Sequence, residues 1–88
     1  MNPSELIGLQ VALKVRGSLE FKNWSRDLEQ YRKFCLYIAE NIKPHAPKYS
    51  QLIDSYIKVV KEAKSIDEIL EAAKVVWVAS GGILDLAP

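Results

Sequence analysis

The sequence is poor in the residues that build disulfides, metal sites and tight turns. It holds one cysteine, one histidine, four glycines and four prolines among its 88 residues. A single cysteine, Cys35, cannot form an intrachain disulfide or a thiolate metal site, and a single histidine, His45, lacks the partner ligands that zinc requires. So few glycines and prolines leave too few turns for a sandwich or a barrel, which indicates a small number of long elements.

Long apolar runs are missing as well. No stretch of the sequence approaches the ~18–20 consecutive apolar residues that cross a bilayer. The first residues also lack the basic stretch and the apolar run of a signal peptide. We therefore expect a cytoplasmic protein with no membrane contact, no bound metal and no cofactor.

An excess of charge of one sign is also absent, because the net charge at pH 7 is only +1. Domains that bind nucleic acid usually carry a clear basic excess, since phosphate contacts supply much of their affinity. The basic side chains are nevertheless concentrated before residue 65, which leaves room for a modest basic surface. A small nucleic-acid-binding regulator is therefore the alternative function. Its candidate residues are Lys14, Arg16, Lys22, Arg26, Arg32 and Lys33.

The composition that is present describes a globular protein. Hydrophobic residues make up 49% of the chain and charged residues 26%, a balance that supports a packed core and a hydrated surface. A chain of this length forms one domain. We interpret residues 1–88 as a single helical domain in which residues 81–88 are a short apolar C-terminal tail.

The longest periodic pattern predicts a helix over residues 19–43. Ser18 suits its N-cap, and Pro44 stops the helix because the residue before a proline avoids the helical region. Such a helix would be the longest in the bundle, so we expect its overhanging part to be covered by the tail, by a partner or by a second copy. The apolar positions recur at steps of three and four, as in a heptad pattern: Phe21, Trp24, Leu28, Tyr31, Cys35, Ile38 and Ile42.

Two more helices are predicted over residues 47–64 and 65–80. Ser65 and Glu68 have the spacing of a capping box at the start of the second one. The pair Gly81–Gly82 ends it, because glycine accepts the left-handed conformation that follows a helix. The residues expected to face inward from this helix are Ile66, Ile69, Leu70, Ala73, Val76 and Trp77.

Residues 3–16 fit two different structures. Asn2, Pro3 and Glu5 are typical of a helix start, and Gly17 would end that helix. The apolar residues between positions 9 and 15, however, alternate with a period of two, which is typical of a β-hairpin. The fold class that we predict is all-α, a four-helix up-and-down bundle; the alternative is an N-terminal β-hairpin followed by three helices.

No constellation of residues points to catalysis. Cys35 lies in the heptad pattern, where a free cysteine behaves as a small hydrophobe, and His45 lies in a proline-flanked loop without a carboxylate. Asp67, Glu68 and Glu71 cluster at a helix start, where capping and the helix dipole account for them. We therefore predict a protein that is not an enzyme.

The remaining features favour protein binding. The chain has more large apolar and aromatic side chains than so small a bundle can bury, and tyrosine and tryptophan are common anchors of interfaces. The candidate contacts with a partner are Tyr37, Tyr49, Leu84 and Leu86. The last two belong to the tail, which either folds back on the bundle or serves as a docking motif.

The predicted function is a non-catalytic protein–protein interaction module, such as a small regulator, an adaptor or an immunity-type inhibitor. Its partner is another protein or a second copy of the chain, the latter giving a homodimer. Length and helical class are similar to those of the small four-helix colicin immunity proteins. The acidic face that those inhibitors use is absent from this sequence, and no motif matches, so we infer no membership of that family.

Overall fold

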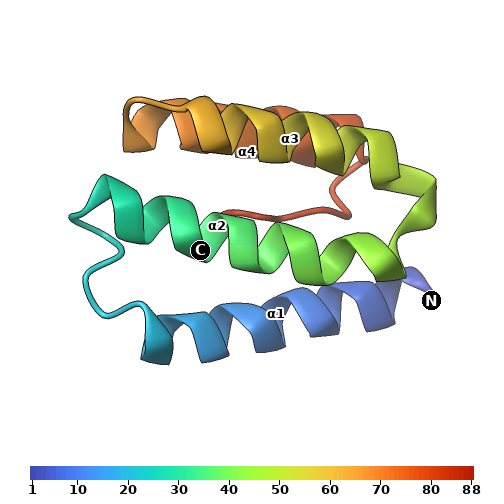
Figure 1. Cartoon of the computed structure of the whole chain (residues 1–88). Helices are drawn as coiled ribbons and strands as arrows, with labels where there is room; N and C mark the ends of the chain where they lie inside the picture. The colour runs from blue at the N-terminus through green and yellow to red at the C-terminus, as the bar shows by residue number, and fades with distance from the viewer.

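The computed structural model describes residues 1–88 as four α-helices joined by short connections (Figure 1). Each helix packs against the next one along the chain, and α2 also contacts α4. The chain is therefore an all-α helical bundle, as the sequence predicts. The helices are α1 (Pro3–Glu20), α2 (Leu28–Ile42), α3 (Ser50–Glu62) and α4 (Ile66–Ala79), and two short 3-10 turns, Lys43–His45 and Pro47–Tyr49, link α2 to α3.

The first segment is helical throughout, so the β-hairpin alternative is wrong. The side chain of Asn2 accepts a hydrogen bond from the amide of Glu5 at 2.9 Å, which caps the helix as predicted. The helix does not end at Gly17, however, but continues to Glu20. Gly17 is buried inside α1, where the absence of a side chain lets the ring of Phe34 approach the helix backbone.

The second helix begins at Leu28, so the prediction of one helix over residues 19–43 is wrong. Ser18 does not cap it and lies within α1. The actual N-cap is Asp27, whose carboxylate accepts the amide of Glu29 at 2.9 Å. A carboxylate at this position satisfies a free amide and also complements the helix dipole. With α2 this short, the expected overhang does not exist.

The turn between α1 and α2 holds the two aromatic residues that the heptad pattern assigned to the helix. Phe21 stacks on Phe34 with ring centroids 5.5 Å apart. Trp24 meets Phe34 edge-on at 5.5 Å and lies 5.9 Å from the ring of Tyr31. Aromatic pairs of this kind contribute about 0.5–1.5 kcal/mol beyond the area that they bury. The apolar pattern thus continues through the turn because the turn itself packs on the core.

The predicted ends of α4 are confirmed. The hydroxyl of Ser65 accepts the amide of Glu68 at 3.2 Å. The carboxylate of Glu68 returns to the amide of Lys64 at 2.7 Å, one residue before the partner expected in a capping box. At the other end, Gly81 and Gly82 have φ angles of 66° and 82°, where a side chain would be strained. The helix therefore stops where the glycines begin.

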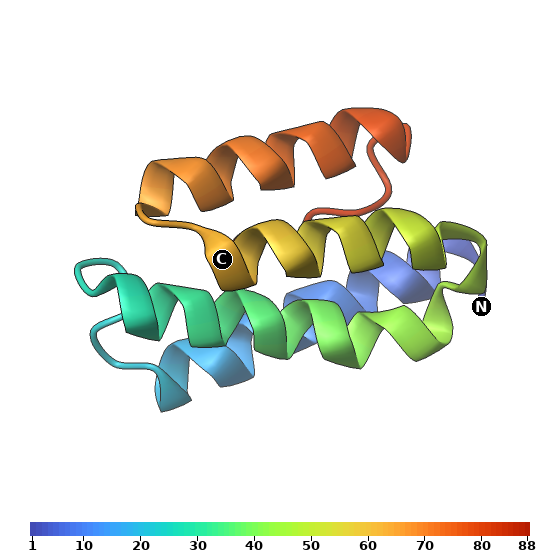
Figure 2. The same ribbon diagram turned by 45° about the horizontal axis from the view of Figure 1, so that its top comes forward.

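The C-terminal strap (residues 81–88) runs back through the bundle in an extended conformation. In Figures 1 and 2 it passes between α1 and the pair formed by α3 and α4. Leu84 and Leu86 on the strap are fully buried and belong to the hydrophobic core with residues of all four helices. Of the two predictions for the tail, folding back on the bundle is therefore the one that the structure shows.

A buried glutamine of α1 holds the strap in place. Gln10 is 2% exposed, and its side-chain amide donates to the carbonyl of Ile83 at 3.0 Å and accepts from the amide of Asp85 at 2.8 Å. The carboxylate of Asp85 in turn lies 3.0 Å from the ammonium of Lys14. Because buried backbone groups need partners, one side chain here does what a neighbouring strand would do.

One flank of α4 is less buried than the sequence predicts. Leu70 and Trp77, both expected to face inward, are 42% and 46% exposed. The main helix neighbours of α4 are α3 and α2. Trp77 instead lines a small pocket together with Val11 of α1 and Gly82 and Ile83 of the strap, so its ring is only partly covered.

Candidate functional site

The four candidate contacts with a partner do not form one surface. Leu84 and Leu86 are fully buried in the core, so neither side chain is available to a partner while the bundle is folded. Tyr37 is half-buried, and its ring lies 6.0 Å from that of Phe21. Tyr49 is half-buried at the end of a 3-10 turn and packs against the core. Both tyrosines thus contribute much of their area to the fold itself.

The basic residues of the nucleic-acid alternative are divided among three elements, and two of them act within the domain. Lys14 pairs with Asp85 on the strap. Arg32 donates to the carbonyl oxygens of Val60 and Lys61 at the C-terminal end of α3, where a cation complements the helix dipole. The other four, Arg16, Lys22, Arg26 and Lys33, are exposed. Two of the six basic side chains are therefore engaged within the domain, and four are exposed at the surface.

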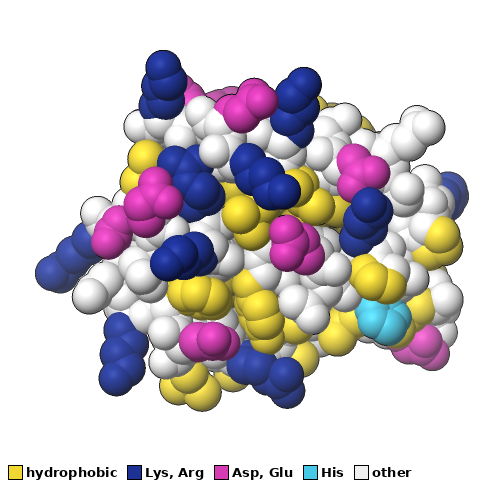
Figure 3. Space-filling view, viewed as in Figure 1, with side chains coloured by type: hydrophobic (Ala, Val, Ile, Leu, Met, Phe, Trp, Pro, Cys, Tyr) yellow, Lys and Arg dark blue, Asp and Glu magenta, His cyan; other side chains and the backbone are white.

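The solvent side of α1 is the first apolar surface that the sequence analysis missed. In a helix, the residues opposite the buried Leu6, Gln10, Leu13 and Gly17 form one outward stripe. We call this stripe the α1 outer face; its members are Ser4, Gly8, Val11, Ala12, Val15 and Leu19, all of them exposed. Figure 3 shows apolar side chains at the surface over α1, at the lower edge of the view.

The α1 outer face contains no charged residue. Val11, Val15 and Leu19 are 56%, 61% and 75% exposed. A Cβ added to Gly8 would meet no atom within 4 Å, so the centre of the face is open to close approach. An 18-residue helix that is apolar on both its inner and its outer side is typical of a helix covered on both sides.

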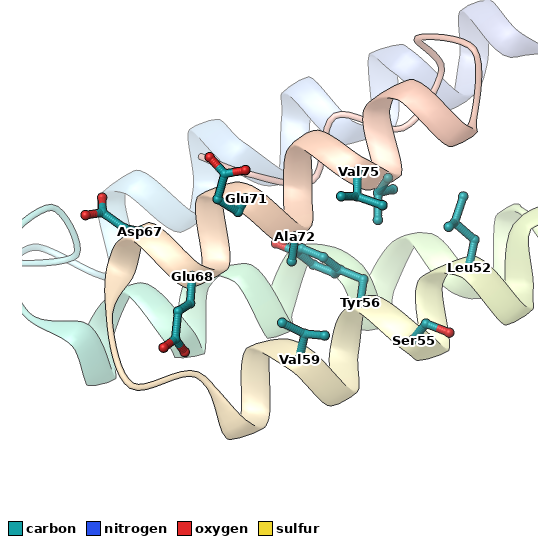
Figure 4. Close-up of a pocket in the computed structure, with 10 residues that line it drawn as sticks. Leu52, Ser55, Tyr56, Val59, Asp67, Glu68, Glu71, Ala72 and Val75 are labelled. Atoms are coloured by element: carbon teal, nitrogen blue, oxygen red, sulfur yellow. The ribbon is translucent and has the colours of Figure 1, made fainter.

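A groove between α3 and α4 is the second apolar surface. It encloses about 600 Å³, a size common in binding pockets. Leu52 and Val59 line the α3 side, Ala72 and Val75 the α4 side, and the ring of Tyr56 lies between the two helices (Figure 4). Ala72 is small, which leaves room for side chains from outside. The groove thus has the form that accepts apolar side chains of another molecule.

The end of the groove at the start of α4 is acidic. Asp67, Glu68 and Glu71 all belong to its lining and all come from the first two turns of α4 (Figure 4). Glu68 is engaged in capping, and the closest cation to Glu71 is Lys74 at 4.0 Å. The α3 side contributes no charged residue to the lining. The groove is therefore apolar along its length and negative at one end.

The groups that could carry chemistry do not assemble into a reactive site. Cys35 is fully buried, and burial raises the pKa of its thiol to about 12, so the nucleophilic thiolate is disfavoured. Burial likewise raises the pKa of Tyr31 to about 12 and that of Tyr56 above its usual range. His45 is exposed in a 3-10 turn. No three histidine, cysteine, aspartate or glutamate side chains gather where they could hold a metal ion.

None of the four helices combines the length and the hydropathy that a membrane span needs. No family model, no curated protein and no solved structure matches this chain. The two apolar surfaces, on α1 and between α3 and α4, are therefore the candidate functional sites of this protein.

Proposed function

We propose that the protein is a non-catalytic protein–protein interaction module that forms a homodimer through the α1 outer face. The observation that carries the proposal is the uncharged, exposed stripe along one side of α1. Contiguous apolar patches on small soluble domains commonly mark interaction sites. A cytoplasmic setting is part of the proposal, and a lone buried cysteine that forms no intrachain disulfide is compatible with it.

The arrangement of the stripe supports a second copy as the partner. Its six positions are symmetric about a point between Val11 and Ala12, so two antiparallel α1 helices related by a two-fold axis would bring matching positions together. A small residue then faces a large one in every pair. The pairs are Ser4 with Leu19, Gly8 with Val15, and Ala12 with Val11. Alternation of small and large residues is what lets two helices pack closely.

The charges beside the stripe are complementary under the same symmetry. Glu5 and Arg16 lie on the same edge of the α1 outer face, near opposite ends of the helix. In an antiparallel pair, Glu5 of one copy comes close to Arg16 of the other, and the contact occurs twice. A pair of this kind contributes little energy when exposed, but it favours the antiparallel direction over the parallel one.

The proposal predicts that Val15→Glu converts the dimer to a monomer. A charge in the middle of an apolar interface costs about 2 kcal/mol or more, which raises the dissociation constant about 30-fold. The mass in solution, measured by light scattering behind a sizing column over a range of concentrations, tests this. Val78→Glu is the matched control, because Val78 is 71% exposed on α4, away from the stripe, and its variant should remain dimeric.

The direction of the helices can be tested with charge reversals. Glu5→Arg and Arg16→Glu should each weaken the dimer at low salt, and the double variant should recover the parent's dissociation constant. A monomeric parent protein at all concentrations, or a Val15→Glu variant as dimeric as the parent, would contradict the proposal. Failure of the double variant to recover would contradict only the antiparallel arrangement.

A further inference from the structure

The groove between α3 and α4 belongs to a different part of the molecule from the α1 outer face. In Figure 1, α1 lies at one edge of the bundle and the α3–α4 pair at the opposite edge, with α2 and the strap between them. No residue of the α1 outer face lines the groove. A dimer formed through α1 would therefore leave the groove open to a partner of a different kind.

From the shape and charge of this groove, we infer that it binds an amphipathic helix of a partner protein, with apolar side chains between α3 and α4 and a lysine or arginine beside Asp67 and Glu71. Grooves between two helices accept a third helix through apolar residues spaced three and four apart. The walls here are 13 and 14 residues long, or about 20 Å, which matches three to four turns of a partner helix.

The charges around the groove set the polarity of the partner. Asp67 makes no ion pair within the domain, and Glu71 has only the distant Lys74. Carboxylates at the edge of an apolar groove suppress acidic partners and attract basic ones, so they act mainly on specificity. The partner's basic residue should therefore lie at the end of its helix that meets the start of α4.

Space for the partner's side chains comes from Ala72. A larger residue at this position would occupy the hollow above Tyr56 without introducing a charge or breaking the helix, since leucine and alanine both favour helices. Ala72→Leu is thus a variant that fills the groove and leaves the fold intact. Val78→Leu adds similar bulk to an exposed position of α4 outside the groove lining and serves as its control.

The test uses two labelled synthetic peptides of 14 residues with leucines at helical spacing, identical except for lysines or glutamates at one end. Binding is measured by fluorescence anisotropy with the full chain carrying Val15→Glu, so that self-association does not contribute. The lysine peptide should bind at least tenfold more tightly than the glutamate peptide. Ala72→Leu should weaken its binding at least tenfold, and Val78→Leu should leave it unchanged. Joint reversal by Asp67→Lys and Glu71→Lys should invert the preference.

Several results would overturn the inference. Equal affinity for the two peptides, no binding of either, or unchanged binding to the Ala72→Leu variant would each do so. If Ala72→Leu instead lowered the mass of the otherwise unchanged protein in solution, the occupant of the groove would be a second copy and not a partner helix. Circular dichroism and urea unfolding of each variant separate loss of binding from loss of fold. Failure of Val15→Glu to dissociate the dimer bears on the proposed function alone.

Discussion

Glycine has opposite roles at two positions of α1. Gly17 lies against the ring of Phe34, and a Cβ at this position would be 2.7 Å from the Cζ atom of that ring. Gly8 faces solvent, and a Cβ there would meet nothing within 4 Å. Both residues weaken the helix by about 1 kcal/mol relative to alanine. At Gly17 the close packing of α1 against α2 offsets this loss of helix stability. At Gly8 no contact within the bundle offsets it.

Alanine substitutions should therefore have opposite effects at these two glycines. Gly17→Ala should lower the free energy of unfolding by about 1–3 kcal/mol, because the strain of overpacking exceeds the gain in helix propensity. Gly8→Ala should raise it by about 0.5–1 kcal/mol. Urea unfolding of both variants in the Val15→Glu background measures the effects without a contribution from dimerisation. Equal effects at the two sites would show that Phe34 moves aside at little cost.

The strap contributes two side chains, Leu84 and Leu86, to the hydrophobic core. It has no regular hydrogen-bonding pattern of its own, and its backbone relies on Gln10 and on the hydroxyl of Ser80, which accepts the amide of Leu84 at 2.9 Å. Its two fully buried leucines belong to a core cluster that includes residues of all four helices. The strap thus packs against the helices as a fifth element, although it is only a few residues long.

Truncation of a strap leucine should be as costly as truncation in a helix. We expect Leu86→Ala to lower the free energy of unfolding by about 2–5 kcal/mol, because it removes buried methyl groups and leaves a cavity. Val78→Ala, at an exposed position, should change it by about 0.5 kcal/mol or less. Both values follow from urea unfolding curves. A loss at Leu86 no larger than at Val78 would mean that the strap detaches easily and is not part of the core.

Helices with local end signals could be predicted from the sequence, and those without could not. Ser65 and the glycines at 81 and 82 carry their own capping chemistry, so the predicted α4 was confirmed almost to the residue. The boundary between α1 and α2 was missed, because Phe21 and Trp24 extend the apolar pattern through a turn. Asp27, the N-cap that the structure shows, lies inside that periodic pattern and was not identified from the sequence.

The apolar surfaces could not be predicted because periodicity does not say which side of a helix faces water. In α1, Leu13 points inward and Val15 outward, and apolar residues on both sides produced the two-residue alternation that suggested a hairpin. The α3–α4 groove depends on how far apart two helices pack, which only tertiary structure determines. Two of the four predicted contacts, Leu84 and Leu86, lie in the core for a related reason, since the core of a small chain buries most of its large apolar residues.

The molecule as a whole presents its two candidate surfaces at opposite edges of the bundle (Figure 1). A dimer through the α1 outer face would carry two copies of the α3–α4 groove, directed away from the two-fold axis. A partner with two suitable helices would then bind by both of them, with an avidity that depends on the length of its linker. Disruption of the dimer should therefore reduce binding of a two-helix partner far more than binding of a single helix.

The titratable groups at the centre of the bundle make its stability sensitive to high pH. The pKa of Cys35 rises from 9.0 in an exposed thiol to about 12 on burial, and that of Tyr31 from 10.0 to about 12. The unfolded chain therefore releases protons that the folded chain retains, so stability falls as the pH rises above about 9.

A cysteine variant can show how much of the loss of stability at high pH comes from Cys35. The free energy of unfolding should be level near pH 7–8 and decline steadily above pH 9, first through Cys35 and then through Tyr31 and Tyr56. Cys35→Ala should make the decline between pH 9 and 10 shallower while lowering stability at neutral pH through the cavity that it leaves. Urea unfolding at a series of pH values measures both slopes. A parent protein equally stable at pH 7 and pH 10.5 would contradict this linkage.

The hydrogen bond between Gln10 and the amide of Asp85 joins positions 75 residues apart. During synthesis the ribosome releases the glutamine early and Leu84 and Leu86 only after all four helices have been made. Until then the nascent helices lack two leucine side chains that belong to the hydrophobic core of the folded bundle. Completion of the core must therefore follow translation of the strap.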